Sequence, residues 1–142
     1  MENDLITGVM ACLRDTFGKD TTVYLDEVKQ ELKEPCFFVR VLEVRQELLI
    51  RNRYRRVYSL DIEYHPREKQ KKTREIAAVA NTLLMSLEYI NIGDNLTRGT
   101  NIYYEVQDKV LHFFIDYDFH VFKVLEKAEL MEELQQNSYV KR

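Results

Sequence analysis

Four residues of one segment have side chains of the types that bind metal ions. They are His112, Asp116, Asp118 and His120, and imidazole and carboxylate groups are common ligands of divalent metals. The apolar residues between them alternate, which predicts a β-strand whose even-numbered side chains share one face. Positions two apart on a strand are separated by roughly 6.5–7 Å, so one strand cannot gather all four residues around one ion. At best Asp118 and His120 contribute to a site completed from elsewhere. We favour a polar sheet face, solvated or paired across a subunit interface, and predict no metal site.

No other combination of residues predicts catalysis. The two cysteines, Cys12 and Cys36, have no histidine next to them and no CxxC spacing, so we expect buried free thiols in a reducing compartment. The sequence has neither a Gly-x-Ser-x-Gly motif nor a glycine-rich phosphate loop. These are the local signatures of common nucleophiles and of nucleotide binding. We therefore predict no catalytic residue, no cofactor and no enzymatic activity.

One basic cluster stands out in a chain whose charges are otherwise balanced. Lys and Arg number 21 against 24 Asp and Glu, which gives a net charge of −3 and argues against a general nucleic-acid binder. The run from Arg51 to Arg56 is basic around a single tyrosine. It could contact phosphates or an acidic partner. A charged β-turn whose arginine stems cover the sheet edge is the interpretation we favour.

The elements that position these residues follow from the spacing of apolar side chains. Helical spacing predicts helices near residues 3–17 and 72–88, the first with Asp4 as its N-cap and Gly18 as its stop. Apolar residues on both faces of the strand at 36–50 predict that both of its sides are covered. Gly99 is expected to mark a bend or bulge. Further strands are expected at 54–64, 96–107 and 110–124, the last two joined by a turn at Asp108 and Lys109.

Together these elements predict an α+β domain over residues 1–125. We expect a mostly antiparallel sheet with two helices packed on one face and a long C-terminal β-hairpin. Residues 126–142 are polar and are expected to form a frayed helix or a disordered tail. The N-terminus lacks the order of a signal peptide and no apolar run is long enough to span a bilayer, so we expect a soluble protein made in a cytoplasm.

Several segments together resemble the tail terminator (tail completion) proteins of long-tailed phages and prophages of Gram-positive bacteria. The resemblance extends over nearly the whole chain up to about Lys123, and it rests on the order and spacing of the segments, since none is chemically diagnostic alone. The matching segments are Glu34-Pro35-Cys36-Phe37-Phe38-Val39, Asn52-Arg53-Tyr54-Arg55-Arg56 with Leu60-Asp61-Ile62-Glu63-Tyr64, Leu96-Thr97-Arg98-Gly99-Thr100-Asn101, and Val110-Leu111-His112-Phe113-Phe114-Ile115-Asp116-Tyr117.

The resemblance implies a structural protein of the virion tail, assembled in the cytoplasm of the host bacterium. Such proteins form a ring, typically a hexamer, that caps the head-proximal end of the tail tube, ends tube polymerisation and helps the head to join. The implied partners are further copies of the chain, the tail tube protein and the head–tail connector protein, with no membrane and no specific nucleic acid. A different small head–tail connector component is the nearest alternative. A small metal-dependent enzyme and a nucleic-acid-binding module are more distant ones.

Ring closure requires one patch of a subunit to dock on a different patch of its neighbour. The projecting hairpin is the natural donor, because its alternating faces offer more apolar surface than two helices can cover. The arginine run is the second candidate contact. The predicted interface residues are Arg53, Arg55, Arg56, Val110, His112 and Phe114.

Overall fold

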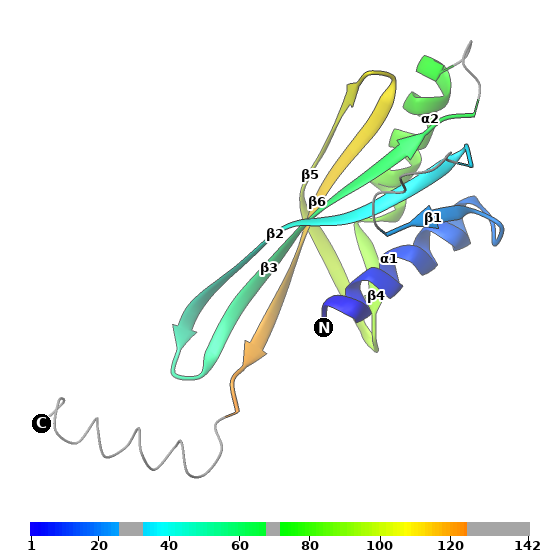
Figure 1. Cartoon of the computed structure of the whole chain (residues 1–142). Coiled ribbons are helices and arrows are strands. Elements are labelled where there is room, and N and C mark those ends of the chain that lie inside the picture. The colour runs from blue at the N-terminus through cyan, green and yellow to red at the C-terminus, as the bar shows by residue number, and fades with distance from the viewer. Residues whose placement is uncertain (26–32, 68–71, 125–142) are drawn as a thin grey trace, which may run out of the picture. The chain divides into compact units, whose positions relative to one another are not determined.

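The chain folds into two helices and one six-stranded sheet. The computed structural model describes residues 1–25, 33–67 and 72–124 (Figure 1). The predicted class, α+β with a mostly antiparallel sheet, is confirmed, and the predicted tail at 126–142 lies outside the described residues. The elements in order are α1 (Glu2–Phe17), β1 (Thr22–Tyr24), β2 (Cys36–Ile50), β3 (Arg53–His65), α2 (Lys72–Ser86), β4 (Tyr89–Ile92), β5 (Asn95–Gln107) and β6 (Val110–Phe122).

The chain divides into two compact units. The first comprises Met1–Arg45 and Val57–Asp118 and contains both helices; the second comprises Gln46–Arg56 and Phe119–Arg142, of which residues up to 124 are described. The single-domain boundary at residue 125 stays a prediction.

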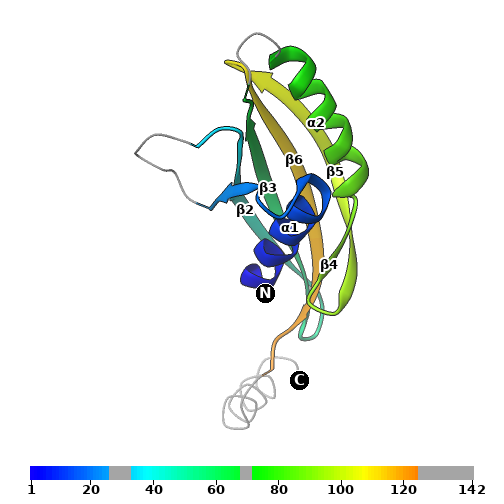
Figure 2. The ribbon, with the colours of Figure 1, turned by 90° about the vertical axis from the view of Figure 1, so that its right-hand side faces the viewer.

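The strand order of the sheet is β1-β2-β3-β6-β5-β4. The β4–β5 and β5–β6 pairs are antiparallel, and the short β1 runs parallel to β2. β3 and β6, which are distant in sequence, are central neighbours that run in opposite directions (Figure 1). Both helices lie on the same face of the sheet (Figure 2), so the opposite face has no helical cover among the described elements.

The core lies between that face and the helices. The odd-numbered residues of β6 from Leu111 to Tyr117 form its centre, because the period of two in the sequence turns them toward the helices. α1 presents Leu5, Val9 and Leu13 to the same layer. These helix residues and the β6 residues Leu111, Phe113, Ile115 and Tyr117 are 0% exposed.

The ends of α1 agree only in part with the sequence prediction. Met1, not Asp4, is the N-cap, and it makes no side-chain capping bond. Asp4 lies in the first turn instead, where a carboxylate still interacts favourably with the helix dipole. Gly18 ends the helix as predicted: its φ is 120°, and its N–H donates to the carbonyl of Arg14 at 2.8 Å.

Two strands were not predicted and two predicted strands need correction. The segments at 22–24 and 89–92 form the unpredicted strands β1 and β4, because three or four residues are too few for a period of two to be recognised. β2 is buried on both faces only from Cys36 to Val39, and Leu42 is already 55% exposed. β6 ends at Phe122 rather than at residue 124.

The β5–β6 hairpin has the turn that its sequence predicts. Asp108 and Lys109 have φ values of 53° and 62°, the left-handed pair of a two-residue hairpin turn. The predicted irregularity near Gly99 is a register shift between Thr100 and Tyr103. Gly99 itself is required for packing, because a Cβ there would overlap the side chain of Ile115.

Candidate functional site

A cluster of four charged or titratable side chains joins the central strands on the helix-free face. Arg40 comes from β2, Asp61 and Glu63 from β3, and His112 from β6. The Arg40 guanidinium lies 2.7 Å from Glu63 Oε2 and 3.5 Å from Asp61 Oδ2. His112 Nδ1 lies 3.2 Å from Asp61 Oδ2 and 3.5 Å from Glu63 Oε1. The cluster therefore links three adjacent strands through one pair of carboxylates.

The cluster is largely withdrawn from water. The side chains of Asp61 and Glu63 are 6% and 14% exposed, and that of Arg40 is 31% exposed. Burial raises the pKa of the Asp61 carboxyl above its usual range, while the hydrogen bond with His112 and the charge of Arg40 act in the opposite direction. Two carboxylates held this close and this deep need a cationic partner, and Arg40 supplies it, while His112 Nδ1 lies within hydrogen-bond distance of Asp61.

The same cluster has the residue types of a metal site. One ligand atom each from Asp61, Glu63 and His112 lie within 4.8 Å of one another, the one such trio among the described residues. Arg40 already contacts both carboxylates, so a bound cation would have to compete with a guanidinium. The arrangement is a network of ion pairs and hydrogen bonds that joins β2, β3 and β6.

The four residues singled out on the long strand do not form one group. His112 joins the cluster, whereas Asp116 accepts a hydrogen bond from Asn101 Nδ2 at 2.9 Å and lies 3.8 Å from the Arg45 guanidinium. Asp118 and His120 fall in different compact units. The spacing argument against a single-strand metal site is consistent with this placement.

The aromatic residue Phe114 forms a stacked pair beside the cluster. Its ring centroid lies 4.7 Å from that of Tyr103, directly opposite on β5, and 6.3 Å from the His112 ring. Tyr103 is 57% exposed. Val110, at the start of β6, is partly exposed next to the hairpin turn. Val110, His112 and Phe114 therefore lie along one face of one strand, and all three are partly exposed.

The arginine run occupies the second compact unit and contacts its own chain. Arg55 Nη1 lies 3.4 Å from Glu47 Oε1, and Arg56 Nε donates to Gln46 Oε1 at 2.7 Å. The guanidinium carbon of Arg53 lies 5.5 Å from the centre of the Phe122 ring. Arg53, Arg55 and Arg56 lie at the start of β3, so the predicted charged turn is limited to the two residues before it, Arg51 and Asn52. The role of the arginines in an assembly stays a prediction.

Two exposed apolar surfaces lie at different places on the sheet. On β2, Leu42 and Val44 are 55% and 46% exposed. On β5, Tyr104 and Val106 are 40% and 53% exposed. The β5 surface borders a hollow of about 230 Å³ against α2, lined by Thr73, Ile76, Ala77, Tyr104, Val106 and Lys109.

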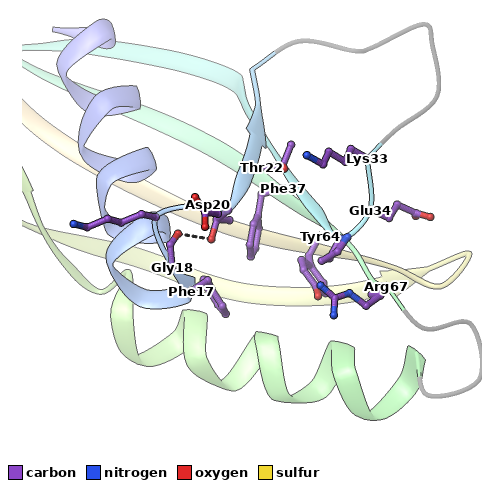
Figure 3. A pocket seen from close by; sticks show the side chains of 12 residues that line it. Phe17, Gly18, Asp20, Thr22, Lys33, Glu34, Phe37, Tyr64 and Arg67 are labelled. Carbon is purple, nitrogen blue, oxygen red and sulfur yellow. Dashed lines mark hydrogen bonds between the residues drawn. The ribbon is translucent and has the colours of Figure 1, made fainter.

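A larger open hollow of about 500 Å³ lies near the end of α1 (Figure 3). Beside it, the Thr21 hydroxyl donates to the Gly18 carbonyl at 2.6 Å. The hollow is lined by both acidic and basic side chains and by three aromatic ones, Phe17, Phe37 and Tyr64. Its lining residues are Phe17, Gly18, Lys19, Asp20, Thr21, Thr22, Lys33, Glu34, Pro35, Phe37, Tyr64 and Arg67. None of these described lining residues is a histidine or cysteine, so among them no nucleophile is paired with an imidazole base.

The sequence prediction missed three of the four cluster residues, Arg40, Asp61 and Glu63. A signal for two of them was present, since Asp61 and Glu63 alternate with the apolar residues of β3. What a single sequence cannot supply is the strand order that sets β3 beside β6.

The fold and its surfaces define a small α+β structural protein with large apolar side chains on the open part of its sheet. A family model described as phage tail terminator protein matches residues 4–129 of the 142. The chain belongs to the phage tail terminator protein family, which is structural and not enzymatic.

Other comparisons add less. No curated protein matches the chain. Among the solved structures that match, one is matched over 89% of this chain and 99% of its own, with 13% identity and a TM-score of 0.42. Among the described helices, none combines the length and the apolar character needed to cross a bilayer.

Proposed function

We propose that the protein forms a closed ring on the head-proximal end of the tail tube, where it ends tube polymerisation and presents a surface to the head connector. Membership of the tail terminator family makes the tail tube its partner. We propose three further points: that the protein forms a ring, that the ring closes from identical copies, typically six, and that it takes part in head joining.

The observation that carries the proposal is that the chain exposes two different apolar surfaces. One includes Leu42 and Val44 on β2; the other includes Tyr104 and Val106 on β5. These strands lie on opposite sides of the β3–β6 centre in the strand order. Two unlike patches that dock on each other are what a head-to-tail interface needs, and such an interface closes into a ring when the rotation permits.

The remaining predicted contacts have natural roles in this scheme. Val110 lies beside the hairpin turn, and Arg53, Arg55 and Arg56 lie at the start of β3, just after the turn that joins it to β2. Both are available to the tube or to the connector after the ring has used the sheet surfaces. Arg53, Arg55, Arg56, Val110 and Phe114 are therefore proposed as contacts with other proteins, and His112 as their support.

Deleting the gene from the phage or prophage tests the function directly. We expect tails of uncontrolled length that fail to join heads in electron micrographs, and normal virions when the intact gene is supplied in trans. Tails of normal length joined to heads in the deletion strain would refute the proposed function.

Complementation with Val110→Asp then tests the hairpin, with Met85→Asp as the control because Met85 is an exposed apolar residue (84%) on α2. Val110→Asp should fold and fail to complement, whereas Met85→Asp should complement. Equal complementation by the two would exclude the hairpin as a contact. His112→Asp is unsuited to this purpose, because it would add a third carboxylate beside Asp61 and Glu63.

A further inference from the structure

We propose that neighbouring subunits join by backbone pairing, with residues 41–45 on the outer edge of β2 lying antiparallel to residues 103–107 on the β5 edge of a second copy. The inference rests on the proposed ring and specifies how its joint is made. The alternative is side-chain docking between sheet faces without strand pairing.

The outer edge of β2 is left open over most of its length. β1 pairs only with Cys36–Phe38, and no other described strand lies beyond β2 in the sheet order. Past that point β2 exposes Leu42 and Val44, both large and apolar. Edge strands of stable soluble proteins are usually short, bulged, covered or rich in inward-pointing charge, because an open edge pairs with other chains. An apolar open edge of this kind is expected to have a partner strand.

The β5 edge is open for a similar reason. β4 pairs only with Asn95–Arg98, so β5 continues without an outer neighbour among the described strands. The irregularity between Thr100 and Tyr103, with Asn101 at a φ of 49°, disrupts the first part of that edge. Bulges are a common device against edge pairing. The regular stretch is therefore Tyr103–Gln107, which pairs with β6 in unbroken register.

A second copy fits these edges better than an unrelated partner does. The edges belong to opposite sides of one strand order, so they cannot meet within a chain, but each meets the other in a ring of identical subunits. β2 and β5 run in opposite directions within the sheet (Figure 1), so a sheet continued from one subunit to the next pairs them antiparallel.

Disulfide crosslinking in assembled tails tests this joint. Val44→Cys is combined in one chain with a cysteine in turn at positions 103, 104, 105 and 106. Opposed residues of an antiparallel pair have Cα atoms about 4.5–5.5 Å apart, within the range that a disulfide bridges. The controls are the unmodified chain, which retains Cys12 and Cys36, and each single cysteine variant.

Oxidation of tails carrying a matched pair should produce a ladder of covalent multimers, because every subunit is linked to both neighbours. The single variants should produce none. A covalent dimer from Val44→Cys alone would mean that β2 pairs with β2, and the proposal would be overturned. Tails that contain the protein but give no multimers with any of the four pairs would also overturn it, while the proposed function would stand.

If the protein is absent from tails, the proposed function fails. The same oxidation is then carried out on the concentrated protein in solution. A ladder there would still support the edge pairing, and no multimers from any of the four pairs would overturn it.

Discussion

Arg40→Met most directly tests the hypothesis that the polar cluster of Arg40, Asp61, Glu63 and His112 holds the strands together. Methionine keeps much of the side-chain length and removes the charge that faces Glu63 at 2.7 Å and Asp61 at 3.5 Å. Breaking a buried ion pair by removing one partner costs about 3–5 kcal/mol, and an exposed pair about 0–1 kcal/mol. Because the Arg40 side chain is 31% exposed and both carboxylates are mostly buried, we expect a loss of about 2 kcal/mol in the free energy of unfolding at pH 8.

The matched control is Arg98→Met. Arg98 pairs with Glu88 at 3.3 Å, but their side chains are 64% and 37% exposed, so the expected loss is within about 0.5 kcal/mol. With a urea dependence of about 2 kcal/mol per molar, the unfolding midpoint should fall by about 1 M for Arg40→Met and by about 0.2 M for the control. Chemical denaturation followed by circular dichroism resolves that difference.

The pH dependence separates a charge effect from a packing effect. The pKa of Asp61 is already raised by burial, and removing Arg40 should raise it further. A carboxyl whose pKa is higher in the folded state stabilises the fold while it is protonated, and that stability is lost as the pH rises through the folded-state pKa. The deficit of Arg40→Met should therefore be smaller at pH 4.5 than at pH 8. A deficit that is the same at both pH values, or no larger than that of Arg98→Met, would refute the network.

Three further predictions concern the core. Tyr117→Phe should lower the free energy of unfolding by about 1–3 kcal/mol, because the buried hydroxyl donates to the Leu87 carbonyl at 2.6 Å and the acceptor would be left unpaired. Gly8→Ala should lower the free energy of unfolding, because the new Cβ would lie 2.6 Å from the backbone oxygen of Asn91. This overlap should outweigh the helix propensity of alanine, which exceeds that of glycine by about 1 kcal/mol. Burial raises the pKa of the Cys36 thiol to about 11; its thiolate fraction at pH 8 should be more than about a hundredfold below that of an ordinary cysteine, so it should be alkylated only on unfolding.

Each of these has a control in the same chain. Tyr103→Phe changes an exposed tyrosine (57%) and should leave the unfolding midpoint unchanged. Thr7→Ala, on the exposed side of α1, should stabilise slightly. Urea-unfolded protein should show both thiols reacting at the same rate. A neutral or stabilising Gly8→Ala, or native Cys36 that reacts as fast as it does when unfolded, would contradict the packing described above.

The sequence predicted the helices and strands that are long enough to show a periodic pattern. It did not predict the short strands or which strands are neighbours in the sheet. The period of two in residues 111–121 was enough to place the centre of the core, because every odd residue up to Tyr117 is fully buried. β1 and β4, with three and four residues, are too short to carry a period. Each becomes a strand because a longer neighbour offers a pairing edge.

The candidate site shows the same division. His112 was singled out for its residue type and its face, and the structure places it on the polar, helix-free face as expected. Its partners Asp61 and Glu63 come from β3, about fifty positions earlier, and the contact exists because β3 and β6 are neighbours in the sheet order. Alternation assigns a residue to a face of its own strand, but it does not tell which strand comes next to it.

The cluster and the open edge become parts of one mechanism when the connections of β2 are considered. Past Phe38, β2 has no described neighbour on its outer side, so β3 alone holds this stretch within the sheet. Arg40 stands at the start of that stretch and binds both carboxylates of β3, which are bound in turn by His112 of β6. An edge strand that pairs with another subunit binds more tightly when it is already ordered, because association then loses no free energy to ordering it. Arg40→Met should therefore impair ring formation even at temperatures where the subunit is still folded, whereas Arg98→Met should not. Equal assembly of the two variants under those conditions would separate the cluster from the joint and leave it a purely structural feature of the subunit.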